Sequence, residues 1–147
     1  MVRIMLIDDH PVVRAGLTAV LENDGQIDVV AQGSDGTAID DLPADVDVVV
    51  TDIQMPTMTG IEVAQKLRAS GGPPVLILTT YDTQADVVGA MEAGALGYVL
   101  KDAPEEDLRA AVLAAAKGER TLSPQVANVL AERLTRPDVA LSAREIE

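Results

Sequence analysis

The stretch VRIMLIDDHP, residues 2–11, decides the fold class of this chain. Val2 to Ile7 is a short, almost continuously apolar run, which is typical of a strand buried on both faces of a parallel sheet. The acidic pair Asp8 and Asp9 follows at once, and Pro11 is suited to the first turn of a helix. A buried strand that leads through acidic residues into a helix predicts an α/β domain with polar chemistry at the carboxyl ends of its strands.

The same alternation of strand and helix recurs along the chain and predicts five βα units around a doubly wound parallel sheet. The expected strands are short apolar runs, all of them buried: Val2 to Ile7, Ile27 to Ala31, Val46 to Thr51, Val75 to Thr79 and Gly97 to Leu100. The expected helices lie between and after them: Pro11 to Asn23, Gly36 to Leu42, Thr59 to Ser70, Gln84 to Ala93 and Pro104 to Lys117. Right-handed crossovers would place helices on both faces of the sheet.

Composition narrows the classes of function. The chain of 147 residues has no cysteine, which leaves no disulfide framework, thiol nucleophile or cysteine zinc site. Its net charge of -13 argues against binding of this segment to a nucleic-acid backbone, because such binding needs a cationic surface. Neither a signal peptide nor an apolar run long enough to span a membrane is evident, so we expect a cytoplasmic protein without membrane contact.

Polar residues follow the strands at their carboxyl ends, which meet at one edge of a parallel sheet. The acids there are Asp8 and Asp9 after the first strand and Asp52 at the end of the third. Carboxylates that lie close together repel one another unless a cation lies among them, so three at one edge predict a site for a hard metal ion. Mg2+, or Mn2+ in its place, prefers such oxygen ligands and typically acts beside phosphates.

Two further strand ends supply groups that suit a phosphoryl oxygen. Lys101 ends the fifth strand, and its ammonium could pair with a carboxylate at rest and neutralise a phosphoryl oxygen afterwards. Thr79 and Thr80 end the fourth strand, where a hydroxyl could donate a hydrogen bond. The acids, the lysine and the threonines together predict a phosphoryl-binding site.

These residues resemble those of a two-component response-regulator receiver domain. The resemblance covers residues 1–118 and is carried by LIDDH at the first strand, VVVTDIQMPTMTG around the third, VLILTT at the fourth and AGALGYVLKD at the fifth. It implies the flavodoxin-like strand order 2-1-3-4-5. It also implies a regulatory phosphoacceptor rather than an enzyme, one that assists its own Mg2+-dependent phosphorylation and dephosphorylation.

The resemblance implies a role for each site residue. Asp52 would be the phosphoacceptor, and Asp8, Asp9, Asp52 and the backbone carbonyl of Gln54 would surround Mg2+. Lys101 and Thr79 would hold the phosphoryl oxygens, while Gln54 and Thr80 would line the mouth of the pocket. After transfer, Thr79 would be drawn toward the phosphoryl group and Tyr98 would turn inward as the switch.

One histidine, His10, follows the acidic pair. With no second imidazole in the chain, a loop residue beside the acids is favoured over a metal ligand, and the sequence assigns His10 no role.

Beyond Gly118 the pattern changes. Residues 119–140 are expected to form a linker that contains an amphipathic helix at about 123–134, capped by Ser123. The stretch TLSPQVANVLAERL resembles the linker helix of the NarL/FixJ subfamily, and LSAREIE at 141–147 resembles the opening of a LuxR-type helix-turn-helix domain. A transcription regulator cut just inside its DNA-binding domain is therefore expected.

The expected partners follow from this resemblance. A sensor histidine kinase would phosphorylate Asp52 and so control homodimerisation, with the first and fifth helices as the subunit contacts. DNA would be bound only through the missing C-terminal domain, because this segment has no recognition helix.

Two rival functions stay open on the residues alone. A stand-alone receiver that docks on a protein target would need nothing after the linker, so the length of the gene separates it from a transcription regulator. An Asp-nucleophile phosphohydrolase of the haloacid-dehalogenase type would carry Asp-x-Asp, whereas Gln54 replaces the second acid here. Flavodoxin-like cofactor binding is disfavoured, because the first strand leads into DDHP rather than a Ser/Thr/Gly-rich phosphate loop.

Overall fold

The computed structural model describes residues 1–53, 55–79, 84–101 and 103–122. Its strands are β1 (Val2–Ile7), β2 (Ile27–Gly33), β3 (Val48–Thr51), β4 (Val75–Thr79), β5 (Gly97–Leu100) and β6 (Thr121–Leu122). Its helices are α1 (Pro11–Glu22), the 3-10 helix η1 (Gly36–Asp41), α2 (Gly60–Ser70), α3 (Gln84–Glu92) and α4 (Glu105–Ala116). The predicted helix at about 123–134 and the predicted start of a helix-turn-helix domain at 141–147 lie outside the described residues.

The strands form one parallel sheet in the order β2-β1-β3-β4-β5-β6. The predicted five-strand order 2-1-3-4-5 is therefore confirmed. The two residues of β6, which the sequence did not predict as a strand, extend the sheet beyond β5, with Thr121 opposite Gly97. The order reverses between β1 and β3, so the carboxyl ends of these strands flank the switch point where doubly wound folds place their chemistry.

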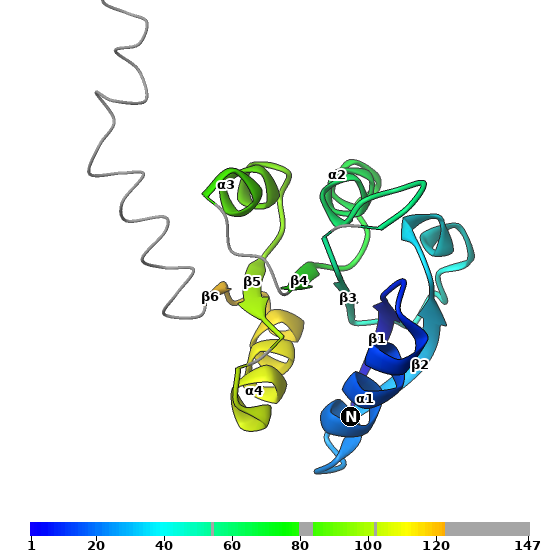
Figure 1. Ribbon diagram of the computed structural model, residues 1–147, viewed down its shortest axis with the longest axis vertical. Helices are drawn as coiled ribbons and strands as arrows, with labels where there is room; N and C mark the ends of the chain where they lie inside the picture. The colour runs from blue at the N-terminus through cyan, green and yellow to red at the C-terminus, as the bar shows by residue number, and fades with distance from the viewer. Residues whose placement is uncertain (54, 80–83, 102, 123–147) are drawn as a thin grey trace, which may run out of the picture.

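Helices cover both faces of the sheet, as expected from right-handed crossovers (Figure 1). Side chains alternate along each strand, so Ile4 and Leu6 pack in one core beneath α1 and α4. Met5 and Ile7 pack in the other core beneath α2 and α3. Apolar burial on both faces explains why the strands are almost continuously apolar in sequence.

The second predicted helix is a six-residue 3-10 helix, η1, rather than an α-helix. Asp35 caps its start, since its side chain accepts a hydrogen bond from the Thr37 amide at 2.8 Å. Leu42 ends it in an extended conformation, with φ of -62° and ψ of 122°. The residue before a proline avoids helical conformation, so Pro43 leaves no room for a longer helix.

The prediction that all five strands are buried is wrong for β2. Only Ile27 is buried in that strand, which extends to Gly33 rather than ending at Ala31. The reason is its place at the end of the sheet, where it has one neighbouring strand. β3 also begins at Val48 rather than Val46, because Asp47 turns toward Arg3 and its Oδ2 accepts a hydrogen bond from the Arg3 amide.

Within the parts of the chain that the structure describes, none of the helices has the length and apolar character needed to cross a membrane.

Candidate functional site

The carboxyl ends of three strands bring acidic and basic side chains together. Asp8 directly follows β1, Asp52 directly follows β3 and Lys101 directly follows β5. These strands run parallel, so their ends meet at the same edge of the sheet. Asp8 and Asp52 are both buried there, although a carboxylate is rarely buried without a partner.

Lys101 is the partner of both carboxylates. Its Nζ lies 2.5 Å from Oδ2 of Asp8 and 3.1 Å from Oδ2 of Asp52, and its side chain is 11% exposed. Burial by itself lowers the pKa of Lys101, but its hydrogen bonds to Asp8 and Asp52 and their charges outweigh that effect. The net pKa of Lys101 is raised, so the ammonium is charged at neutral pH and neutralises part of the acidic site.

Backbone amides hold the remaining oxygens of the two buried acids. Oδ1 of Asp8 accepts a hydrogen bond from the His10 amide at 2.8 Å. Oδ1 of Asp52 accepts one from the Ile53 amide at 2.7 Å. Each carboxylate is thus fixed by one amide and by Lys101, which presets its orientation.

Asp9 differs from the other two acids. Its Oδ1 is buried but has no hydrogen-bond partner among the described residues. The Nδ1 atom of His10 lies 2.9 Å from it, within ion-pair distance but without the direction of a hydrogen bond. A buried acceptor without a donor is costly, and a cation beside it would remove that cost.

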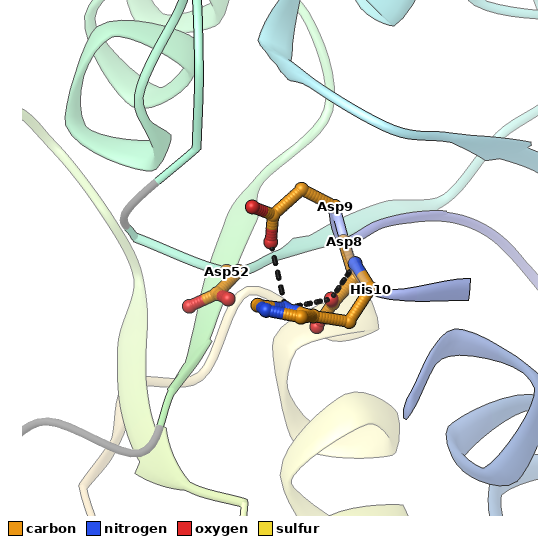
Figure 2. Close-up of side chains that lie close together, drawn as sticks. All are labelled: Asp8, Asp9, His10 and Asp52. Carbon is orange, nitrogen blue, oxygen red and sulfur yellow. Dashed lines mark hydrogen bonds and ion pairs between the residues drawn. The ribbon is translucent and has the colours of Figure 1, made fainter. Parts of the chain in front are cut away.

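The site residues lie close enough to share one ion. Figure 2 shows Asp8, Asp9, His10 and Asp52 gathered at the end of the sheet, and one ligand atom from each lies within 4.8 Å of the others. Carboxylate oxygens are the ligands that hard divalent cations prefer. The three carboxylates and the unsatisfied oxygen of Asp9 fit such an ion.

The loop after Asp52 is packed closely against the site. A Cβ on Gly60, the first residue of α2, would lie 2.2 Å from the carbonyl oxygen of Asp52. The Gly60 amide also donates a hydrogen bond to the carbonyl oxygen of Ile53 at 2.8 Å. Within this loop Thr57 has a positive φ of 68°, which is unfavourable for a β-branched residue.

Arg14 was not identified as a site residue from the sequence. Its guanidinium donates to the carbonyl oxygen of Asp8 at 2.7 Å and to that of Gly33 at 3.2 Å. It therefore ties the loop that carries the acidic pair to the end of β2. Only its spacing of six residues from Asp8 could have identified Arg14 from the sequence, and an arginine in the first turns of a helix is usually a surface residue.

For the other described residues that the sequence singled out, the structure gives a position in the fold and, for His10, a contact with the acids. Thr79 is the last residue of β4 and pairs in register with Leu100, the residue before Lys101. Tyr98 is 0% exposed and belongs to the core beneath α2 and α3. Gln54 and Thr80 lie outside the described residues. His10 lies beside the acids, as expected, and its imidazole joins their group.

A doubly wound parallel sheet with buried acids and a lysine at its switch point defines a flavodoxin-like α/β domain with its chemistry at the carboxyl ends of the strands. A family model described as the response regulator receiver domain matches residues 4–113. The chain belongs to this family, which is regulatory rather than catalytic.

Named relatives support this family assignment. The chain is 40% identical over 134 residues to the nitrate/nitrite response regulator protein NarP of Escherichia coli, covering 89% of this chain and 62% of NarP. It is 36% identical to the transcriptional regulatory protein LiaR of Bacillus subtilis, covering 100% of this chain and 74% of LiaR. The chain thus spans less than two thirds of NarP.

A solved structure is also similar. It is the crystal structure of the response regulator ChrA in a heme-sensing two-component system, with 58% sequence identity and a TM-score of 0.79. The match covers 99% of this chain and 71% of ChrA. The relatives support the reading of this chain as part of a two-component response regulator related to NarL-type regulators.

Proposed function

We propose that this chain receives a phosphoryl group on Asp52 and acts as the switch of a two-component transcription regulator. The observation that carries the proposal is the bridge from Lys101 to Asp8 and Asp52 at the switch point of the sheet. Asp52 is buried beside this ammonium, with 7% of its surface exposed. An ammonium beside a nucleophilic carboxylate is suited to neutralise incoming phosphoryl oxygens.

The reaction is the transfer of a phosphoryl group from a donor to the Asp52 side chain. A carboxylate oxygen of Asp52 forms a bond to phosphorus while the bond from phosphorus to a histidine nitrogen of the kinase, or to the acyl oxygen of acetyl phosphate, breaks. The leaving group keeps the bonding electrons. Positioning supplies most of the catalysis, because the hydrogen bond from the Ile53 amide fixes Asp52 and Lys101 balances the charge.

Asp8, Asp9 and Asp52, with the backbone carbonyl of Gln54, would hold the metal ion in this proposal. Oδ1 of Asp9 supports it, because that buried oxygen accepts no hydrogen bond from the described residues. When bound, Mg2+ or Mn2+ would offset the repulsion between carboxylates and phosphoryl oxygens. Lys101 would then exchange its contact with Asp52 for a phosphoryl oxygen while it keeps Asp8.

Thr79 and Tyr98 would transmit the change, with Thr80 and Gln54 at the pocket mouth. Tyr98 is buried in this structure, so the phosphoryl group would stabilise its inward position rather than create it. Such a population shift requires that the phosphoryl group bind the active state more tightly than the inactive one.

The proposed partners come from the family. A sensor histidine kinase would supply the phosphoryl group in the cytoplasm, as the two-component system of ChrA suggests. Phosphorylation would favour a homodimer, with α1 and α4 as the contacts. DNA would be bound by a LuxR-type helix-turn-helix domain whose first residues are 141–147, in keeping with the transcriptional regulatory role in the name of LiaR.

Intact-mass measurement after incubation with acetyl phosphate and Mg2+ tests the proposal. We expect a gain of about 80 Da for this chain, and none for Asp52→Asn or when Mg2+ is withheld. A gain of the same size in Asp52→Asn would remove Asp52 as the phosphoacceptor. No gain in the unaltered chain would contradict the phosphorylation mechanism itself.

A further inference from the structure

The side chain of His10 lies beside the acids, although it has no role in capping α1. It is the N-cap residue of α1, but its side chain makes no capping hydrogen bond among the described residues. The imidazole instead turns toward the acids, with Nδ1 2.9 Å from Oδ1 of Asp9 and 3.5 Å from Oδ1 of Asp8 (Figure 2). The backbone amide of His10 binds Asp8, which fixes the residue beside the site.

The separation of the two atoms matches that of two ligands on one ion. Neighbouring ligands at right angles on a six-coordinate ion with bonds of about 2.1 Å lie about 3.0 Å apart. Nδ1 of His10 and Oδ1 of Asp9 are 2.9 Å apart. Both atoms also belong to the group whose ligand atoms lie within 4.8 Å of one another.

The hydrogen bonding of the Asp9 oxygen supports the same conclusion. Oδ1 of Asp9 is buried and has no hydrogen-bond donor among the described residues, although Nδ1 of His10 lies next to it. A simple pairing of imidazole and carboxylate would direct an N–H bond at that oxygen. The two atoms instead lie at ion-pair distance without a hydrogen bond between them, as two ligand atoms of one ion would.

We propose that His10 is a ligand of the metal site through Nδ1 and gives this site a preference for divalent first-row transition ions, such as Zn2+ and Co2+, over Mg2+. Imidazole nitrogen suits these ions, whereas Mg2+ takes oxygen ligands and retains water. The inference rests on the proposed function, because it concerns the same metal site.

The test uses the imidazole of His10 as its own reporter. His10 is the only histidine of the chain, so the imidazole nitrogen-15 resonances belong to one residue. Substoichiometric Zn2+ should shift the Nδ1 resonance, and excess Mg2+ should reverse the shift because both ions compete for one site. Calorimetry should show Zn2+ binding weakened at least about tenfold in His10→Ala, with Mg2+ binding changed by less than about twofold.

Asp9→Asn separates the built site from adventitious binding to an exposed imidazole, since the His10 side chain is 66% exposed. We expect it to weaken Zn2+ binding on the order of tenfold or more and to weaken Mg2+ binding as well. An Nδ1 shift that persists unchanged in Asp9→Asn, or that excess Mg2+ does not reverse, would overturn the inference. Equal Zn2+ affinity in His10→Ala and the unaltered chain would also overturn it.

The same titrations distinguish failure of the proposed function from failure of the inference about His10. If Mg2+ produces neither heat nor resonance shifts near Asp8 and Asp52, the Mg2+ step of phosphorylation is wrong, whatever Zn2+ does. If Mg2+ binds and only the Zn2+ result fails, the receiver chemistry stands and His10 is not a ligand.

Discussion

Gly60 lies against the backbone of Asp52, and a Cβ at this position would come within 2.2 Å of the Asp52 carbonyl oxygen. The same Cβ would lie 3.0 Å from Cα of Ile53. Both contacts are with backbone, which cannot rotate away as the end of a flexible side chain can. The start of α2 therefore approaches the proposed phosphoacceptor as closely as the chain allows.

Gly60→Ala should displace Asp52 and lower both stability and phosphorylation. We expect unfolding free energy to fall by about 1 to 3 kcal/mol, as for other overpacked sites. Acetyl phosphate should also label Asp52 more slowly, because the carboxylate moves relative to Lys101. Urea denaturation and the time course of the mass gain measure the two effects.

Gly16→Ala is the matched control. Gly16 is exposed in the interior of α1, and a Cβ there would meet no described atom within 4 Å. Alanine should raise stability by about 0.5 to 1 kcal/mol and leave the labelling rate unchanged. Loss of labelling in both variants would show that the effect at Gly60 does not depend on contact with Asp52.

Lys101→Met should leave two buried carboxylates without their shared partner. Removal of one member of a buried ion pair commonly costs about 3 to 5 kcal/mol, and labelling by acetyl phosphate should fall by about a hundredfold or more. The double variant Lys101→Met/Asp52→Asn should be more stable than the sum of the single changes predicts, because one uncompensated charge is removed. Additive stability changes in thermal or urea unfolding would argue against coupling between Lys101 and Asp52.

Two threonines in the loop before α2 should respond in opposite directions. Thr57 has a φ of 68°, which costs an L-residue about 1 to 2 kcal/mol, so Thr57→Gly should raise stability by about 1 kcal/mol after the entropy of glycine is offset.

Thr59 caps α2: its hydroxyl accepts from the Glu62 amide at 3.2 Å, and its amide donates to the Glu62 side chain at 2.9 Å. Thr59→Ala should lower stability by about 1 kcal/mol.

Denaturation of both variants under one condition provides the comparison. A loss of stability in Thr57→Gly would show that the Thr57 side chain makes contacts worth more than the strain it relieves.

Arg14→Met should loosen the loop that presents the acidic pair. Loss of the hydrogen bonds to Asp8 and Gly33 should weaken Mg2+ binding by about 10- to 100-fold, in the range seen when groups that orient metal ligands are removed. Arg14→Lys keeps the charge but not the planar guanidinium that donates to both carbonyl oxygens. It should therefore recover only part of the Mg2+ affinity lost in Arg14→Met. Full restoration by lysine in a calorimetric Mg2+ titration would show that charge alone matters.

The sequence predicted the fold where local pattern suffices. β1, β4 and β5 have the predicted bounds because their apolar runs end at acids, threonines or a lysine that cannot be buried without partners. The prediction failed at η1 because periodicity suggested an α-helix while Pro43 and the Asp35 cap limit the segment to a single short 3-10 helix. It also failed for β2, whose exposure depends on a position in the sheet that its own residues do not encode.

The amino-acid sequence by itself determined the succession of strands and helices and the set of acids and lysine at the carboxyl ends of the strands. Only the tertiary structure decided that Lys101 bridges Asp8 and Asp52, that Gly60 must lack a side chain, and that Oδ1 of Asp9 has no hydrogen-bond donor among the residues the structure describes. Lys101 is separated from Asp8 by 93 residues and from Asp52 by 49. Periodicity reports on the neighbours of a residue along the chain, whereas distances between particular atoms on different strands are set by strand register and side-chain packing.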